Sequence, residues 1–339
     1  MREPPFWWQD RSAKALLLAP LGAIYGAVAA QRLARAGRRV RVPVVCIGNP
    51  TVGGAGKTPT ALAVAHLLQA AGERPAFLSR GYGGTLAGPV VIDPTTHRAT
   101  AVGDEPLLLA RAATTVVARD RVKGARAAAD AGAGVIVMDD GFQNPSLAKD
   151  VAILVVDSRR GIGNGRVIPA GPLRAPLDVQ LDHAQALVIV GAGIPADLGT
   201  RAKARGLPVF GARLVPDAGI VAALGGGRVL AFAGIGDPEK FFATLREAGV
   251  AVAATRRFDD HHRYTRADAQ ALAEHADRDG LILVTTEKDL VRMQGEDATA
   301  ELAARAHALP VTLAFDDEAG FRALLMRHIA GGARNNSRE

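Results

Sequence analysis

A glycine-rich segment at residues 51–58 constrains the fold of this chain more than any other feature. It lies between a short apolar run at 44–47, typical of a buried strand, and a helix-like stretch at 60–69. A turn of this kind points several backbone N–H groups at one spot, which the positive end of the helix dipole also faces. The segment therefore predicts a phosphate-binding loop, and we assign all its residues to nucleotide binding: Thr51, Val52, Gly53, Gly54, Ala55, Gly56, Lys57 and Thr58.

The last two residues of this loop carry its chemistry. Lys57 can reach the β- and γ-phosphates of a nucleotide, and the Thr58 hydroxyl can bind Mg²⁺. The strict pattern has a glycine at the position where this chain has Thr51. The alternative is a glycine-rich turn with a chance lysine, but the flanking strand and helix favour the phosphate loop.

The composition is compatible with a nucleotide-binding protein. The chain has 339 residues and a hydrophobic fraction of 48%, and a chain of this length suggests about two domains with a sizeable core. Its single cysteine, Cys46, lies in the expected strand and permits no internal disulfide, which fits a reducing compartment. The net charge of +7 suits a nucleotide, an anionic lipid or a nucleic acid, or reflects codon usage, so charge alone excludes none of these.

The N-terminal segment has the residues of a membrane-surface helix. Two tryptophans, Trp7 and Trp8, precede a weakly charged stretch at 13–30, and five arginines follow at 32–41. Pro20 and Gly22 are expected to interrupt the apolar stretch, which favours a helix lying in the interface over one that spans the bilayer. Tryptophan and arginine both prefer the headgroup level of a membrane. The alternative is a helix that packs on the core of the protein itself.

The remainder of the chain alternates strand-like and helix-like stretches. Strand-like runs lie at 44–47, 75–78, 90–92, 115–118, 135–138, 152–156, 187–190 and 209–214, with helix-like stretches between several of them. Continuous apolar strands separated by helices predict an α/β fold of the P-loop NTPase type, with a mostly parallel sheet covered by helices on both faces. In such sheets ligands bind at the carboxyl ends of the strands.

A glycine turn at 225–227 precedes a second, smaller α/β pattern. Its expected strands are 228–233, 250–255 and 281–285, and its expected helices are 238–248, 265–277 and 318–329. We therefore expect three parts: an N-terminal membrane-associated helix at 1–35, a phosphate-loop domain at 36–220, and a C-terminal α/β domain at 221–335.

Two acidic segments follow expected strands or precede expected helices. Asp139 and Asp140 end the run at 135–138, where phosphate-loop proteins usually hold Mg²⁺. Adjacent aspartates with no local basic partner repel each other, which favours a cation or substrate over a plain acidic loop. Asp104 and Glu105 stand just before a helix. The residues alone favour Asp104 as an N-cap, and the alternative is a general base.

Residue type alone does not decide the role of three further polar segments. Residues 258–264 contain two histidines and two aspartates, which favour a carboxylate–histidine acid–base pair over a two-histidine metal site. A capped loop before the helix at 265 is the alternative. The loop at 157–174 is either a phosphate-binding or a solvated loop, and contains Arg159, Arg160, Arg166 and Arg174. Residues 285–289 are either a polar turn or part of a cleft.

Together these segments resemble the tetraacyldisaccharide 4′-kinases, the lipid A 4′-kinases of Gram-negative bacteria. The matching segments run in the order of the family and cover nearly the whole chain: 48–59, 79–83, 103–106, 120–121, 139–143, 169–174, 258–261 and 285–289. One position departs from the family, which usually has histidine after Gln143, where this chain has Asn144.

The resemblance implies an activity and a location. The activity is transfer of the γ-phosphoryl group of ATP, with Mg²⁺, to the 4′-hydroxyl of a tetraacylated glucosamine disaccharide 1-phosphate. The location is the cytoplasmic face of the inner membrane, as a peripheral or monotopic protein. The implied partners are ATP, the acylated disaccharide and the lipid surface, with no nucleic acid.

The resemblance also implies roles for residues in the matching segments. Asp104 is the expected base, assisted by His261, which reverses the preference for an N-cap. Lys57 acts on the γ-phosphate, and the expected Mg²⁺ ligands are Thr58, Asp139 and Asp140. We expect the substrate contacts to come from Arg80, Glu105, Gln143 and Arg174.

A second class of protein shares part of this pattern. Membrane-associated partitioning or regulatory ATPases have the same glycine–lysine–threonine core, but usually carry a second lysine before the glycine pair, where this chain has Val52. Transfer of labelled phosphate to the glycolipid indicates the kinase, and release of free phosphate alone indicates the ATPase.

Overall fold

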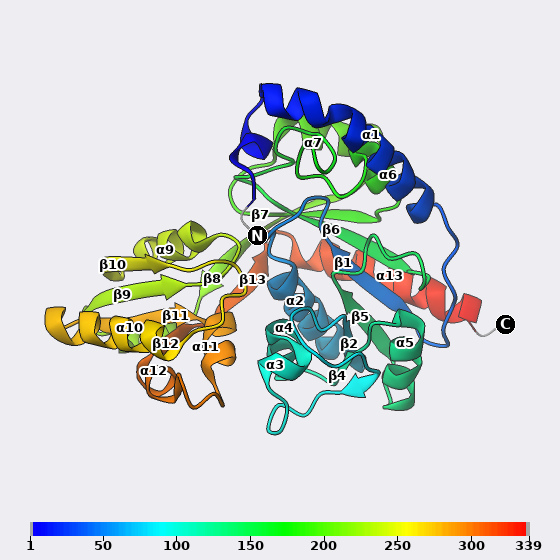
Figure 1. The fold of residues 1–339 in the computed structure, drawn as a ribbon. Coiled ribbons are helices and arrows are strands. Elements are labelled where there is room, and N and C mark those ends of the chain that lie inside the picture. The colour runs from blue at the N-terminus through cyan, green and yellow to red at the C-terminus, as the bar shows by residue number, and fades with distance from the viewer. Residues whose placement is uncertain (1–2, 337–339) are drawn as a thin grey trace.

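A nine-stranded sheet forms the centre of the larger of two lobes (Figure 1). The computed structural model describes residues 3–336. The strands of this sheet are β1 (Val44–Gly48), β2 (Pro75–Ser79), β3 (Val90–Val91), β4 (Thr115–Val117), β5 (Val135–Asp139), β6 (Val151–Asp157), β7 (Ala186–Val190), β8 (Val209–Pro216) and β13 (Val311–Phe315). Their spatial order is β13-β8-β7-β6-β1-β5-β2-β4-β3. Only the edge strands β3 and β13 pair antiparallel, so the predicted mostly parallel sheet is confirmed.

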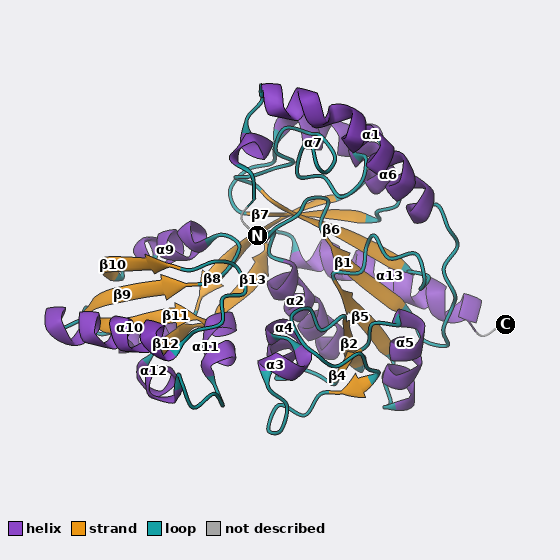
Figure 2. Cartoon of the chain, viewed as in Figure 1, coloured by secondary structure: helices purple, strands orange, loops and turns teal. Residues whose placement is uncertain are grey.

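Helices cover both faces of this sheet (Figure 2). One face packs against α2 (Lys57–Ala70) and α13 (Glu318–Asn336), with Leu68 and Phe321 fully buried in the shared core. The opposite face packs against α5 (Arg121–Asp130), α6 (Leu177–Asp182) and α7 (Ala196–Ala204). Two short helices, α3 (Ala99–Val102) and α4 (Asp104–Leu109), precede β4. Because both faces are buried, the central strands are apolar throughout, which is the pattern that predicted them.

The smaller lobe has its own four-stranded parallel sheet. Its strands, in spatial order, are β10 (Ala251–Arg257), β9 (Arg228–Ala233), β11 (Ile282–Thr286) and β12 (His307–Leu309). Its helices are α8 (Ala218–Ala223), α9 (Pro238–Glu247), α10 (Arg266–Asp279), α11 (Glu287–Met293) and α12 (Ala300–Arg305). Thr265 caps α10 in a capping box with Asp268, as its position before the helix indicates. Helix α11 packs against α4 and so joins the two lobes.

The C-terminal segment belongs to the larger lobe, which differs from the expected C-terminal domain at 221–335. Strand β13 pairs with β8, and α13 lies across the large sheet. The rings of Phe315 and Phe321 stack with centroids 4.1 Å apart, and Phe321 also meets Phe210 of β8. This aromatic cluster draws residues 311–336 back to the larger lobe, so two neighbouring strands connect the lobes.

Helix α1 (Ala13–Leu33) follows a short 3₁₀ turn, η1 (Pro5–Trp8). It runs through Pro20 as one helix, so the interruption expected at Pro20 and Gly22 is wrong. A Cβ on Gly22 would lie 2.8 Å from the carbonyl oxygen of Val167, so this glycine allows close approach to the larger lobe. Among the described residues α1 is the one helix that is long and apolar enough to cross a membrane, with a mean hydropathy of 1.6.

The outer side of α1 is apolar and uncovered. Six large side chains are between 47% and 81% exposed: Leu16, Leu17, Leu21, Ile24, Tyr25 and Val28. The helix lies along the outside of the larger lobe and packs against α6 (Figure 1). An exposed apolar stripe of this kind indicates a surface that binds an apolar partner or a membrane.

Candidate active site

The glycine-rich segment connects β1 to α2, as the sequence predicts. Gly53 and Gly56 adopt φ values of +100° and +92°, which favour glycine, and Gly56 is the N-cap of α2. The Lys57 ammonium donates to Asn49 Oδ1 at 3.2 Å, and Asn49 Nδ2 donates to the Gly53 carbonyl at 3.1 Å. The Asn49 side chain thus connects Lys57 to the backbone of the loop.

The loop residues from Val52 to Thr58 line a cavity of about 750 Å³ between the two lobes. Thr51 is placed differently, because it is buried and its backbone is held by the loop at 172–174. The Arg174 Nε donates to the Thr51 carbonyl at 3.0 Å, and the Val52 N–H donates to the Pro172 carbonyl at 2.8 Å. Backbone atoms of Thr51 and Val52 therefore anchor the start of the loop to residues 172–174.

The two aspartates at the end of β5 lie beside the loop and have opposite environments. Asp140 is within 3.7 Å of the Lys57 ammonium and accepts from Arg174 at 2.8 Å. Burial opposes its ionisation, but these two charges outweigh burial and hold the pKa of Asp140 below its usual range. Its backbone has a φ of 50°, a conformation that turns the chain sharply after the strand.

Asp139 is buried, and its Oδ1 atom has no hydrogen-bond partner. Burial, with the charges of Glu105 and Asp140, raises the pKa of Asp139 to about 7. An unpaired carboxylate oxygen beside a phosphate loop fits a divalent cation, and Thr58, which lines the same cavity, could supply a second oxygen. The described residues form no group of three or more His, Cys, Asp or Glu that could hold a metal alone. Mg²⁺ suits such a site because it usually takes one or two carboxylates and completes its shell with phosphate and water.

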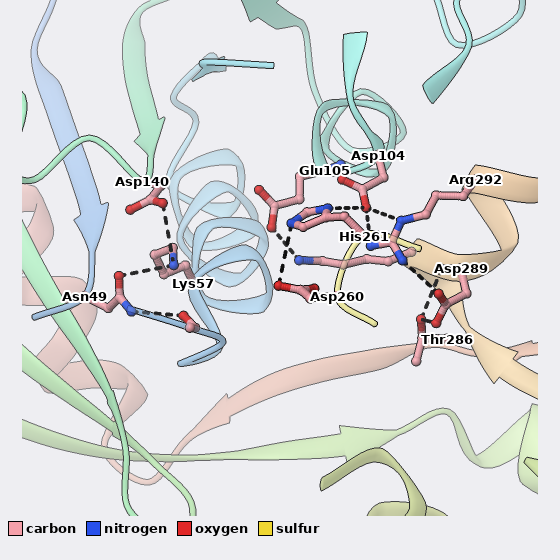
Figure 3. Close-up of polar contacts among 12 residues, drawn as sticks. Asn49, Lys57, Asp104, Glu105, Asp140, Asp260, His261, Thr286, Asp289 and Arg292 are labelled. Carbon is pink, nitrogen blue, oxygen red and sulfur yellow. Dashed lines mark hydrogen bonds and ion pairs between the residues drawn. The ribbon is translucent and has the colours of Figure 1, made fainter. Parts of the chain in front are cut away.

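Asp104 is the first residue of α4, and the N-cap is Gly103, so the N-cap alternative is wrong. The Asp104 carboxylate is 4% exposed and faces the smaller lobe. Its Oδ2 lies 3.3 Å from His261 Nδ1 and accepts from Arg292 Nε at 2.6 Å (Figure 3). Burial opposes its ionisation, but the His261 hydrogen bond and the Arg292 charge hold the pKa of Asp104 below its usual range.

His261 approaches from the loop after β10 and is on the cavity side of this pair. It lines the cavity, whereas Asp104 lies behind it and is not among the described lining residues. The hydrogen bond to Asp104 raises the pKa of His261 above its usual value. The neighbouring His262 turns away: its Nε2 lies 3.1 Å from Asp268 Oδ2, and its ring stacks on Phe258. The two histidines therefore face different targets.

The four residues expected to contact substrate all line the cavity, but three have protein partners. Glu105 accepts from Lys288 of α11 at 2.5 Å, and Arg174 pairs with Asp140. Gln143 donates to the Asn49 carbonyl and to Gln180, both at 3.0 Å, which supports the loop. Arg80 is exposed at the end of β2.

The arginine-rich loop after β6 faces the smaller lobe, where its arginines meet carboxylates. Arg159 pairs with Asp237 of the smaller lobe, and Arg160 pairs with Asp237 and with Glu3. Residues 285–289 could be a polar turn or part of a cleft by sequence alone. The structure shows that they are part of the cleft, because Thr286 and Lys288 line the cavity. Sequence alone could not assign these partners, since each pair joins residues far apart in the chain.

Three features thus meet at one cavity between the two α/β lobes. They are the phosphate loop, the acidic end of β5 and the Asp104–His261 pair. This arrangement defines a phosphotransferase of the P-loop class.

Comparison with known proteins specifies the family. The family model of tetraacyldisaccharide-1-P 4′-kinase matches residues 14–330. The chain is 57% identical to the tetraacyldisaccharide 4′-kinase of Rhodopseudomonas palustris, covering 99% of this chain and 98% of that protein. It is 55% identical to that of Nitrobacter winogradskyi, covering 97% and 98%. The chain therefore belongs to the tetraacyldisaccharide 4′-kinase family, and it is a kinase with an alcohol group as acceptor.

A solved structure agrees with the fold. LpxK from Aquifex aeolicus, crystallised in complex with ATP, superposes with a TM-score of 0.71 at 26% identity. The match covers 93% of this chain and 99% of that one. Both lobes described above are therefore part of the family fold.

Proposed function

We propose that the chain transfers the γ-phosphoryl group of ATP to the 4′-hydroxyl of a tetraacylated glucosamine disaccharide 1-phosphate. The observation that carries this proposal is that the phosphate loop and the Asp104–His261 pair meet at one cavity. The names of the relatives supply the acceptor, and the ATP complex of the Aquifex aeolicus protein supports the donor.

The donor half of the site consists of the loop and the acidic pair. Backbone N–H groups of residues 53–57 cradle the phosphates at the N-terminus of α2, and Lys57 neutralises the charge on the γ-phosphate. Thr58 and Asp139 would hold Mg²⁺, with Asp140 beside Lys57. Bound there, the ion would stabilise negative charge that develops on the transferred group.

The acceptor half is the Asp104–His261 pair. The sugar oxygen attacks the γ-phosphorus, the bond to the leaving ADP oxygen breaks, and the hydroxyl proton passes to the pair. His261 lies on the cavity side, and Asp104 behind it supplies the negative charge. Phosphoryl transfer has a loose transition state, so holding the hydroxyl in line with the γ-phosphate is the main task of this half.

The N-terminal helix would place the active-site cavity next to the membrane that contains the lipid-borne acceptor. Arg32, at the end of α1, lines the same cavity, while the apolar side of α1 faces outward. We infer that α1 lies in the cytoplasmic face of the inner membrane and presents the cavity to the headgroup of the acylated disaccharide. The arginines that follow α1 are suited to anionic lipid.

An assay with γ-³²P-labelled ATP and the tetraacylated disaccharide 1-phosphate tests this proposal. Label should appear in the glycolipid with the wild-type protein and be lost with Lys57→Met. The result that would overturn the proposal is release of free phosphate without labelled glycolipid, which is the behaviour of a regulatory ATPase.

A further inference from the structure

A buried arginine of the smaller lobe contacts the carboxylate at the centre of the proposed acceptor half. Arg292 lies on α11, and its side chain is 7% exposed. Its Nε donates to Asp104 Oδ2 at 2.6 Å, and its Nη2 contacts the same oxygen. The two lobes therefore meet at this carboxylate through the Arg292 guanidinium as well as through His261 (Figure 3).

The opposite edge of the guanidinium is fixed within the smaller lobe. Arg292 Nη1 donates to Asp289 Oδ1 at 2.8 Å and to the Gly234 carbonyl at 2.6 Å. Asp289 is itself fully buried and accepts from the Tyr264 hydroxyl at 3.0 Å and from the Gly234 N–H at 3.1 Å. These hydrogen bonds hold the Asp289 carboxylate in one orientation. Because Arg292 donates to that carboxylate, the orientation of the guanidinium group is fixed as well.

Gly234 ties this network to the histidine. Its carbonyl accepts from the His261 backbone N–H at 3.0 Å as well as from Arg292. A Cβ at this position would lie 3.1 Å from Asp289 Oδ1 and from the Asp259 carbonyl. The close packing around Gly234 therefore sets the distance between the His261 loop and the arginine.

We propose that Arg292 is a positioning residue that fixes the Asp104 carboxylate against His261, and that Asp289 in turn fixes Arg292. This inference rests on the proposed function of the Asp104–His261 pair. Fixing Asp104 in this way requires arginine, because one planar guanidinium can bridge the Asp104 and Asp289 carboxylates and the Gly234 carbonyl at once. Lysine brings the same charge, but its single ammonium cannot hold both edges.

The test compares Arg292→Gln, Arg292→Lys and Asp289→Asn with the wild-type protein. We expect kcat to fall about tenfold or more in Arg292→Gln and by less in Arg292→Lys, with the KM for ATP near the wild-type value. Asp289→Asn should behave like Arg292→Lys, because the arginine keeps its charge but loses its orientation. Arg305→Gln, which removes an arginine from an exposed ion pair of the same lobe, is the matched control and should keep the wild-type kcat.

A titration of His261 by NMR separates positioning from a merely structural role. Asp104 and Asp260 favour the protonated imidazole, and the Arg292 charge opposes it. The Asp104 hydrogen bond is the largest of these effects, so if Arg292 holds Asp104 in place, Arg292→Gln should move the His261 titration to lower pH, whereas loss of the Arg292 charge alone would move it to higher pH. Arg292→Lys should move it to lower pH by less. These spectra also report whether each variant is folded, and Arg292→Lys and Asp289→Asn decide the question where Arg292→Gln does not fold.

Three results would overturn the inference: wild-type kcat in Arg292→Lys and Asp289→Asn, a loss of kcat matched by an equal rise in the KM for ATP, or a His261 titration that stays in place or moves to higher pH in folded Arg292→Gln. Asp104→Asn serves as the reference. If it is inactive while the Arg292 variants are normal, only this inference fails. If Asp104→Asn is itself active, the proposed role of the pair fails.

Discussion

We expect the unpaired carboxyl of Asp139 to make the metal-free protein less stable as the pH rises. Burial, with the charges of Glu105 and Asp140, raises its pKa from an ordinary value of 3.8 to about 7. Between these two values the folded state keeps a proton that the unfolded state has lost. The free energy of unfolding therefore decreases as the pH rises from about 4 to about 7.

The size of the effect follows from the shift. A difference of about three pKa units, at 1.36 kcal/mol each, corresponds to about 4 kcal/mol. Asp139→Asn removes the titrating group and keeps the shape of the side chain. In a chelator, the variant should match the wild-type protein near pH 3 and exceed its stability by up to about 4 kcal/mol at pH 8.

Urea unfolding followed by far-UV circular dichroism, at several pH values in detergent, measures this difference. Asp130→Asn removes an exposed carboxylate of α5 and should give a curve parallel to that of the wild-type protein. A stability difference between Asp139→Asn and wild type that is the same at pH 3 and pH 8 would refute the reasoning. Added Mg²⁺ and ATP should stabilise the wild-type protein more than the variant, because the ion pairs with the ionised carboxylate.

The same structure leads to four further expectations. Asp104→Asn should lower kcat by about 10² to 10⁴ with little change in the KM for ATP, and steady-state rates within about threefold of wild type would contradict this. Lys57→Met should weaken binding of labelled ATP, so unchanged affinity in equilibrium dialysis would argue against the loop assignment. The pair Leu17→Asp and Ile24→Asp should reduce sedimentation with anionic vesicles, and equal sedimentation would show that α1 is not the membrane contact. Gly22→Val should destabilise the protein by about 1 to 3 kcal/mol, since its side chain meets the Val167 carbonyl, and an unchanged Tm would contradict that packing.

The sequence predicted the parts of the site that depend on local order. A strand, a glycine turn and a helix follow one another directly at 44–70, so the phosphate loop and the position of Lys57 could be predicted. The same holds for Asp139, which ends a fully apolar strand at the carboxyl edge of the sheet. The role of Asp104 depended on the family resemblance, because the residues alone favoured a cap.

What the sequence did not predict depends on contacts between distant segments. The return of residues 311–336 to the larger lobe depends on an aromatic cluster with Phe210, more than a hundred residues earlier. Arg292 could be connected to Asp104 only once the smaller lobe was placed against α4. Pro20 was expected to interrupt α1, but the helix accommodates it beside the close glycine contact with the larger lobe.

In the proposed reaction, one cavity brings the γ-phosphate of ATP to the 4′-hydroxyl of a lipid-borne disaccharide. The most direct measurement of this reaction is the position of the new phosphate in the product, read by ³¹P–¹H correlation NMR after incubation with ATP and the tetraacylated disaccharide 1-phosphate. We expect a new phosphorus signal that correlates with the proton on carbon 4′. A phosphate on any other carbon, or free phosphate with unmodified glycolipid, would contradict it.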